Sequence, residues 1–202
     1  MCCLDHRRIY RRRRSNQIKM RIRDIHESSP LTFKGSVTKD LMISKYWICE
    51  ILKELDLTDF STVYILGSWY GNMAYILHRC DIDFEKIINV DINRKWLGFS
   101  HRMLKHAGID NVESMRKDAN DLDYRQVDKN SLVINTSVPD IQGHAWFDNI
   151  PDGTLVVLQD RDEDPDPKIL DRFKFSEILY QGHRELEDLE TTYTRYMIIG
   201  RK

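Results

Sequence analysis

Short apolar segments alternate with amphipathic helical segments along most of this 202-residue chain. The apolar segments have the length and β-branched content of buried strands; they cover residues 62–66, 86–90, 112–116, 131–135 and 153–159. Apolar residues at helical spacing predict a helix from Ser36 or Thr38 to Leu55, with Ser36 as a candidate N-cap, and further helices over 71–80 and 94–107. Because strands that alternate with helices through short loops form parallel sheets with right-handed crossovers, the pattern predicts an α/β domain.

The alternation ends near the C-terminus. Residues 173–182 and 191–199 both have strand-like patterns, and only a charged stretch over 184–190 separates them. That connection is too short for a helical crossover, so we expect an antiparallel hairpin. Residues 160–167 contain five acidic residues and two prolines, which predicts a solvated loop.

The net charge of −1 hides an uneven distribution. Residues 1–23 carry nine basic residues and one acid, a charge of +8, so residues 24–202 carry −9. We therefore expect a basic, disordered arm over residues 1–23 and a single domain over residues 24–202. The acidic domain argues against nucleic acid as its partner and favours a small or cationic acceptor, whereas the arm can bind nucleic acid or an anionic membrane surface. Met20 is an alternative start, which would leave residues 1–19 outside the protein.

The four cysteines fit neither a disulfide framework nor a zinc site, and we expect no bound metal. Cys49 and Cys80 lie in apolar helical patterns, which is typical of buried thiols in a reducing compartment, and we expect a cytoplasmic protein. Cys2 and Cys3 precede an arginine run, an arrangement also found in acylated membrane anchors. Because no run of 18 apolar residues is present, the sequence predicts no transmembrane segment.

Three features at the ends of predicted strands point to one ligand site. Residues 66–71, Leu-Gly-Ser-Trp-Tyr-Gly, join the first strand to a helix, where Gly67 permits a tight turn and Gly71 lets a ligand approach the helix N-terminus. Asp91 ends the second strand, where a carboxylate can bind both hydroxyls of a ribose. Asp118 and Ala119 follow the third strand, where Asp118 can accept a hydrogen bond from an adenine amino group. Each feature alone is also typical of a turn or a helix N-cap, so the prediction depends on their joint occurrence.

With these residues the chain resembles the class I S-adenosylmethionine-dependent methyltransferases over about residues 36–202. The resemblance rests on residues 63–71, 89–91, 117–119 and 132–135. It implies a Rossmann-like three-layer sandwich with a seven-stranded, mostly parallel sheet of order 3-2-1-4-5-7-6 and an antiparallel C-terminal strand. It also implies S-adenosyl-L-methionine as cofactor, with contacts from Gly67, Ser68, Trp69, Gly71, Asp91, Ile92, Asp118, Ala119, Asn135 and Lys39.

The chain departs from the family pattern at two positions. Ile65 stands where an acidic residue is usual, and Trp69 stands where a glycine is usual. These departures leave open an altered cofactor site. The resemblance places the substrate near the segment after the fourth strand, which contains the candidate acid or base residues Asp140 and His144. Trp146 and Phe147 are candidate walls for the substrate.

We expect direct in-line methyl transfer to a small-molecule acceptor. Residues 135–138 lack the Asn/Asp-Pro-Pro-aromatic run of enzymes that methylate nucleic-acid amines, and the charge of −9 also argues against such a substrate. Two alternatives remain: another reaction of the same cofactor, such as aminopropyl transfer or cofactor cleavage, and a non-catalytic binding module whose basic arm contacts nucleic acid or membrane. The missing Gly-x-Gly-x-x-Gly pattern argues against a nicotinamide-dependent oxidoreductase.

Overall fold

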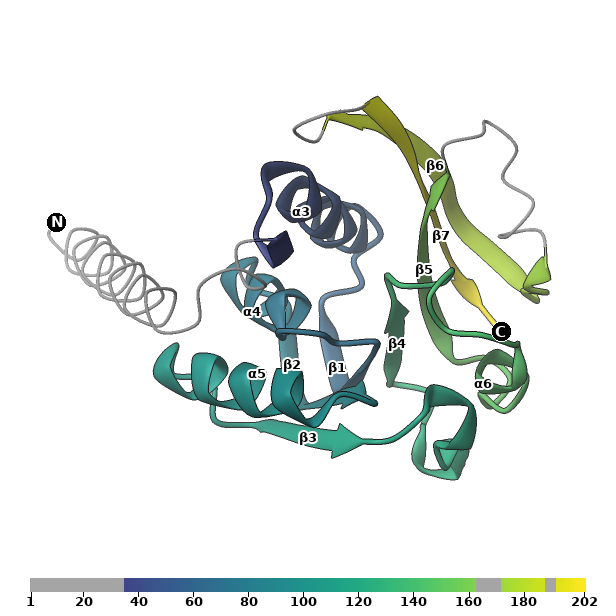
Figure 1. The fold of residues 1–202 in the computed structure, drawn as a ribbon. Coiled ribbons are helices and arrows are strands. Elements are labelled where there is room, and N and C mark those ends of the chain that lie inside the picture. Colours follow the sequence, from purple (N-terminus) through teal and green to yellow (C-terminus); the bar gives the residue numbers. More distant parts are fainter. Residues whose placement is uncertain (1–34, 163–171, 188–191) are drawn as a thin grey trace, which may run out of the picture.

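The computed structural model describes residues 35–162, 172–187 and 192–202, so the predicted arm over residues 1–23 lies outside the described residues. One seven-stranded sheet of order β3-β2-β1-β4-β5-β7-β6 runs through the molecule (Figure 1). Its strands are β1 (Asp59–Leu66), β2 (Asp83–Asp91), β3 (Val112–Arg116), β4 (Leu132–Asn135), β5 (Leu155–Asp162), β6 (Glu177–Glu187) and β7 (Thr192–Arg201). Strands β1 to β5 are parallel, and β7 is antiparallel to both β5 and β6. This topology confirms the predicted fold class and the C-terminal hairpin.

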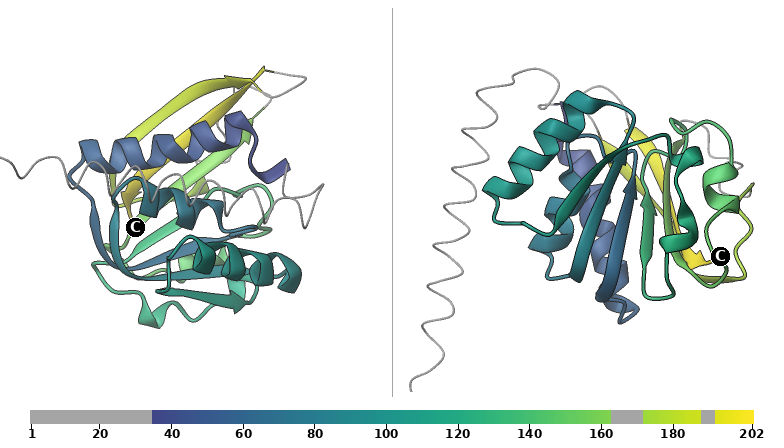
Figure 2. Two further views of the ribbon diagram at one scale, coloured as in Figure 1. Left: turned by 90° about the vertical axis from the view of Figure 1, so that its left-hand side faces the viewer. Right: turned by 90° about the horizontal axis from the view of Figure 1, so that it is seen from below.

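Helices cover both faces of the sheet and complete three layers (Figure 2). Helices α3 (Lys39–Glu54), α4 (Asn72–Arg79) and α5 (Arg94–His106) pack on one face. The short helix α6 (Ala145–Asp148) and the 3₁₀ turns η1 (Ala119–Asp121) and η2 (Tyr124–Gln126) pack on the other. Each face therefore has its own apolar core.

Strand β1 shows why the sequence produces this arrangement. Successive side chains of a strand point to opposite faces, and here Val63 and Ile65 join the core under α3 and α4 while Tyr64 and Leu66 join the core under α6. All four side chains are buried. A strand covered on both faces must be apolar without interruption, which is the pattern typical of a parallel α/β sheet.

Several expected element boundaries were wrong; among them, β6 begins at Glu177 rather than at residue 173. Strand β5 continues to Asp162, and Asp160 is only 2% exposed, so the predicted solvated loop does not begin at residue 160. Strand β6 continues to Glu187 through residues expected to form a charged connection. Both strands are longer because β7 pairs with them over residues 155–162 and 177–187, so backbone hydrogen bonds continue each strand past the end that the sequence pattern predicted. Thr38, not Ser36, is the N-cap of α3.

The loop between β1 and α4 requires a glycine at the residue where it meets α4. Gly71 is the N-cap of α4 and has φ of 78°, and a Cβ added there would overlap the Oγ of Ser100 on α5. Left-handed backbone is unfavourable for residues with a Cβ, and the overlap adds to that cost. Gly71 therefore permits close packing of the loop against α5.

We expect Gly71→Ala to lower the free energy of unfolding by about 3 kcal/mol, because it combines left-handed strain with overpacking. Gly98→Ala is the matched control, since Gly98 lies within α5 and its added Cβ would have its closest contact at 3.8 Å, with Arg102. That variant should gain up to about 1 kcal/mol from helix propensity. Urea unfolding followed by circular dichroism measures both, and equal stabilities of Gly71→Ala and wild type would contradict the packing described for this loop.

Candidate functional site

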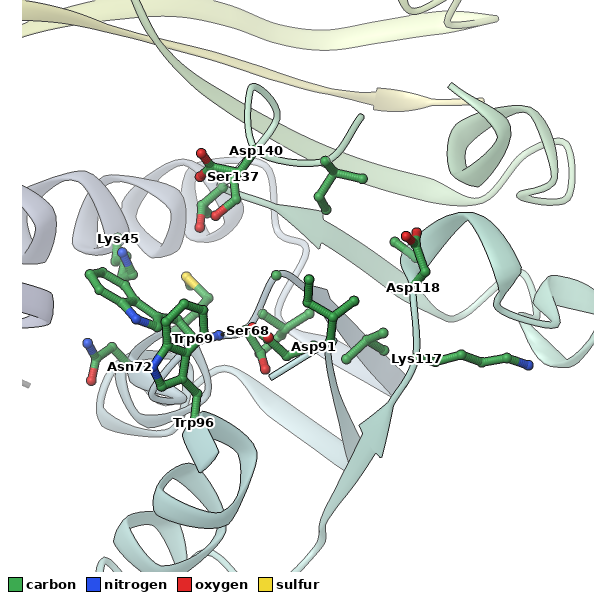
Figure 3. A pocket seen from close by; sticks show the side chains of 18 of the residues that line it. Lys45, Ser68, Trp69, Asn72, Asp91, Trp96, Lys117, Asp118, Ser137 and Asp140 are labelled. Atoms are coloured by element: carbon green, nitrogen blue, oxygen red, sulfur yellow. Dashed lines mark hydrogen bonds between the residues drawn. The ribbon is translucent and has the colours of Figure 1, made fainter. Parts of the chain in front are cut away.

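A cavity of about 670 Å³ opens at the carboxyl edge of the parallel strands, where α3, β7 and the loops after β1 to β4 meet (Figure 3). This edge is where doubly wound sheets bind ligands. The predicted residues that line it are Gly67, Ser68, Trp69, Asp91, Ile92, Asp118, Ala119 and Asp140. The structure thus brings together residues from four separate segments that sequence reasoning placed at one site.

The Asp91 carboxylate lines the cavity at the end of β2 and is only 6% exposed. Its Oδ2 accepts a hydrogen bond from the Trp69 backbone N–H at 2.9 Å, and its Oδ1 accepts one from the Asn93 N–H at 2.8 Å. The carboxylate therefore holds the loop after β1 against the start of α5. A carboxylate has about four lone-pair sites, so acceptor capacity remains for a ligand hydroxyl.

The loop after β1 lines the cavity and packs closely against the loop after β4. Gly67 has φ of 60°, and a Cβ added to it would lie 3.1 Å from the Cβ of Ser137. The Oγ of Ser68 and the Nε1 of Trp69 are buried without a hydrogen-bond partner among the described residues. The half-buried Trp69 ring packs 5.4 Å from the ring of Tyr70 and 6.0 Å from that of Trp96, between centroids. This loop therefore leaves two polar side-chain atoms without a partner in the described part of the chain.

Asp118, Ala119 and Ile92 form the other end of the cavity. The Oδ1 of Asp118 accepts hydrogen bonds from the backbone and side-chain N–H groups of Asn120, at 2.8 and 3.0 Å, which leaves Oδ2 outside these bonds. Ile92 is 66% exposed, an unusual position for a large apolar side chain, and it lines the cavity. This end offers an apolar surface beside a carboxylate oxygen.

Four predicted site residues do not line the cavity. Lys39 is exposed on α3, and Gly71 packs the loop after β1 against α5. Asn135 is fully buried, and its Oδ1 accepts a hydrogen bond from the Ser137 N–H at 2.9 Å, so it shapes the loop after β4. His144 is the exposed N-cap of α6, and its ring lies 5.2 Å from that of Phe173, between centroids.

The expectation that Trp146 and Phe147 form substrate walls was wrong. Both side chains are buried in the core under α6, on the opposite face of the sheet from α3. Their apolar bulk fills that layer, which explains why two large aromatic residues occur together in a helix of four residues.

Lys45 and Arg195 line the cavity although sequence reasoning did not select them. Lys45 is 8% exposed and Arg195 is 6% exposed. Burial, together with the nearby Arg195 guanidinium, lowers the pKa of Lys45 to about 7, against an opposing effect from Asp40. A usable signal for Lys45 existed, because it lies at helical spacing with Leu41, Ile48 and Leu52 on the apolar face.

Two hydrogen bonds fix α3 over the sheet and so fix the position of Lys45. The Nε2 of Gln159 on β5 donates to the Ser44 carbonyl oxygen at 2.8 Å, and the hydroxyl of Tyr193 on β7 donates to the Asp40 carboxylate at 2.6 Å. Burial alone would raise the pKa of Asp40, but hydrogen bonds, including that from Tyr193, lower it on balance. Burial and the Asp40 carboxylate raise the pKa of Tyr193, so this pair stays a carboxylate and a phenol.

The fold is shared with solved methyltransferase structures. The chain is similar to a magnesium protoporphyrin IX methyltransferase from Synechocystis, solved with bound S-adenosylmethionine, at 15% identity over 99% of both chains with a TM-score of 0.61. It is similar to an rRNA methylase from Streptococcus thermophilus at 18% identity over 82% of this chain and 99% of that chain, with a TM-score of 0.56. It is also similar to a precorrin-6y C5,15-methyltransferase from Geobacter metallireducens at 15% identity over 82% and 89%, with a TM-score of 0.50.

These likenesses show that the chain has the fold of class I S-adenosylmethionine-dependent methyltransferases. No protein-family model matches the chain, and no curated protein matches its sequence. In the part of the chain that the structure describes, no helix is long and apolar enough to span a membrane. Within the same residues, no three histidine, cysteine or acidic side chains are grouped as metal ligands.

We expect the buried Lys45 to make stability depend on pH. Its pKa of about 7 in the folded protein lies below the ordinary 10.5, so unfolding takes up a proton between these values and wild-type stability rises across that interval. Lys45→Met removes this contribution, whereas Lys39→Met, at an exposed position of the same helix, keeps it. Denaturant unfolding at pH 6 and pH 9 should show wild type gaining stability relative to Lys45→Met, and a difference that does not change with pH would contradict the assignment.

Proposed function

We propose that this chain is an S-adenosylmethionine-dependent methyltransferase that transfers a methyl group directly to a small-molecule acceptor. The observation that carries the proposal is the Asp91 carboxylate, which is fixed by two backbone N–H groups in the wall of a 670 Å³ cavity. The shared fold supports the proposal, because that cavity lies at the carboxyl edge of the parallel strands.

The lining residues fit an adenosyl group. Asp91 can accept hydrogen bonds from ribose hydroxyls through its remaining lone pairs. Ile92 and Ala119 offer apolar contact to a base, and the Oδ2 of Asp118 can accept a hydrogen bond from an adenine amino group. The unpartnered Oγ of Ser68 and Nε1 of Trp69 can meet polar atoms of the same ligand.

When bound, S-adenosylmethionine supplies a methyl group already activated by its sulfonium. The chain then has to hold the acceptor nucleophile within about 3–3.5 Å of that methyl and, for an acceptor that must lose a proton, to take the proton up. Asp140 suits the second task, because it lines the cavity on the loop after β4 and is positioned by a hydrogen bond from its backbone N–H to the Ser137 carbonyl oxygen at 2.9 Å. His144 does not line the cavity, so Asp140 alone is the residue that we propose to accept the proton.

The charge of the domain supports a small acceptor. The rRNA methylase with the same fold is named for an RNA substrate, but residues 24–202 of this chain carry −9, which opposes the approach of a polyanion. A cavity of 670 Å³ lies within the range typical of small-molecule sites.

Calorimetric titration with S-adenosylhomocysteine tests the cofactor assignment. We expect saturable binding by wild type and a loss of about tenfold or more for Asp91→Ala, because hydrogen bonds to a charged group contribute about 1.5–3 kcal/mol. Asp83→Ala is the matched control, since Asp83 is an exposed acid at the far end of the same strand, and it should bind like wild type.

Circular dichroism should confirm that both variants are folded. If wild type binds neither S-adenosylmethionine nor S-adenosylhomocysteine, the proposed function is wrong. If folded Asp91→Ala binds as tightly as wild type, the function survives but the ribose assignment is wrong.

A further inference from the structure

We propose that Lys45 and Arg195 form a subsite for an anionic oxygen group of the methyl acceptor, either a carboxylate or a phosphate. This inference rests on the proposed methyltransferase function and adds the chemical class of its substrate. It narrows the expectation from overall charge, which favoured a small or cationic acceptor, to a small acceptor with an anionic group.

The two cations come from opposite ends of the described chain to the same cavity. Lys45 lies on α3, ahead of the sheet, and Arg195 lies on β7, the last strand. The Nη2 of Arg195 donates to the carbonyl oxygen of Thr136 at 2.7 Å, so the guanidinium lies beside the loop that follows β4. Figure 3 shows Lys45 and Asp118 on opposite sides of Asp91, so the subsite lies away from the end assigned to adenine.

Arg195 has a donor that the described residues leave unused. Its side chain is more than nine-tenths buried, and its Nε lacks a hydrogen-bond acceptor among them. An unsatisfied buried donor on a charged group is costly, so such an atom in a cavity wall indicates a ligand acceptor. A carboxylate or phosphate is the partner that a guanidinium binds most favourably.

The surrounding charges do not remove the need for an anion. Asp40 acts on both cations but is bound by Tyr193, and Asp160 acts on Arg195. The Arg161 guanidinium lies over the Tyr193 ring, with its carbon 3.9 Å from the ring centroid, and is not among the residues that line the cavity. Asp140 lines the same cavity, but the nearby acids do not offset the burial of Lys45 and its repulsion by Arg195, so the pKa of Lys45 is lowered to about 7 and an anionic ligand would favour its protonated form.

The cofactor of the proposed reaction adds positive charge to the same cavity. S-adenosylmethionine carries a positive sulfonium and a positive amine against one carboxylate, so its binding adds a further positive charge to the same cavity. An acceptor with an anionic oxygen group lowers the electrostatic cost, because opposite charges in a poorly solvated site attract more strongly than in water. We therefore expect anion and cofactor to bind favourably together.

Calorimetry on the full chain saturated with S-adenosylhomocysteine tests this subsite. The probes are benzoate and inorganic phosphate, with benzamide as the neutral match for benzoate, and sodium chloride holds the ionic strength constant. We expect at least one of the two anions to bind saturably and more tightly than benzamide. Lys45→Met and Arg195→Gln should each weaken that binding about tenfold or more, whereas Lys39→Met should bind like wild type.

The carboxylate of the cofactor is the other anionic group that Lys45 and Arg195 can bind. Titration of the same variants with S-adenosylhomocysteine and with methylthioadenosine, which lacks the carboxylate, separates the two sources. Equal affinities of variants and wild type for both nucleosides support the acceptor subsite. Weaker binding of S-adenosylhomocysteine alone would assign the cations to the cofactor and overturn the proposal.

The remaining outcomes are equally decisive. If S-adenosylhomocysteine binds wild type but neither anion binds saturably, or folded Lys45→Met binds the anion as wild type does, this inference fails while the proposed function stands. If S-adenosylhomocysteine itself does not bind wild type, the proposed function fails first. Lys45→Met provides the test alone if Arg195→Gln does not fold, since the two substitutions lie on different elements.

Discussion

The Asp91 carboxylate is the interaction on which the candidate site depends. It ends β2, and its two oxygens accept the backbone N–H groups of Trp69 and Asn93, so one side chain joins the loop after β1 to the start of α5. Parallel strands bring their carboxyl ends to one edge but do not determine how the following loops are arranged. Asp91 supplies that arrangement, and a buried carboxylate is stable there because both oxygens are hydrogen-bonded.

The opposite wall is built by segments far apart in the chain. Helix α3 precedes the sheet, and β7 ends it, yet the bond from Tyr193 to Asp40 and the bond from Gln159 to the Ser44 carbonyl hold them together. These contacts place Lys45 beside Arg195 in the cavity. The end with Asp91 thus depends on the topology of the sheet, whereas this end depends on side-chain hydrogen bonds that join α3 to β5 and β7.

Sequence reasoning predicted what periodicity and position encode. Gly67 follows a buried strand and Asp91 ends one, and both were found because parallel strands place those ends together. Asp160 was misjudged, because its burial depends on pairing with β7, a contact that neighbouring residues do not reveal. His144 lies at the right distance along the chain, but the start of α6 places it against Phe173. Lys45 was visible as a charge on an apolar helix face, whereas nothing in the pattern of β7 distinguishes Arg195.

Residue 65 is an isoleucine where an acidic residue is usual in the family pattern, and the cavity wall formed by Lys45 and Arg195 offers a physical explanation. Ile65 and Lys45 line the same cavity, and both are buried. A carboxylate at residue 65 would add a negative charge to the cavity that Lys45 lines and would favour the protonated form of Lys45. Ile65 adds no such charge, and Asp40 is the acid that acts on Lys45 in this structure. Ile65 therefore adds no acid to the wall that Lys45 and Arg195 line, as the proposed anionic acceptor requires.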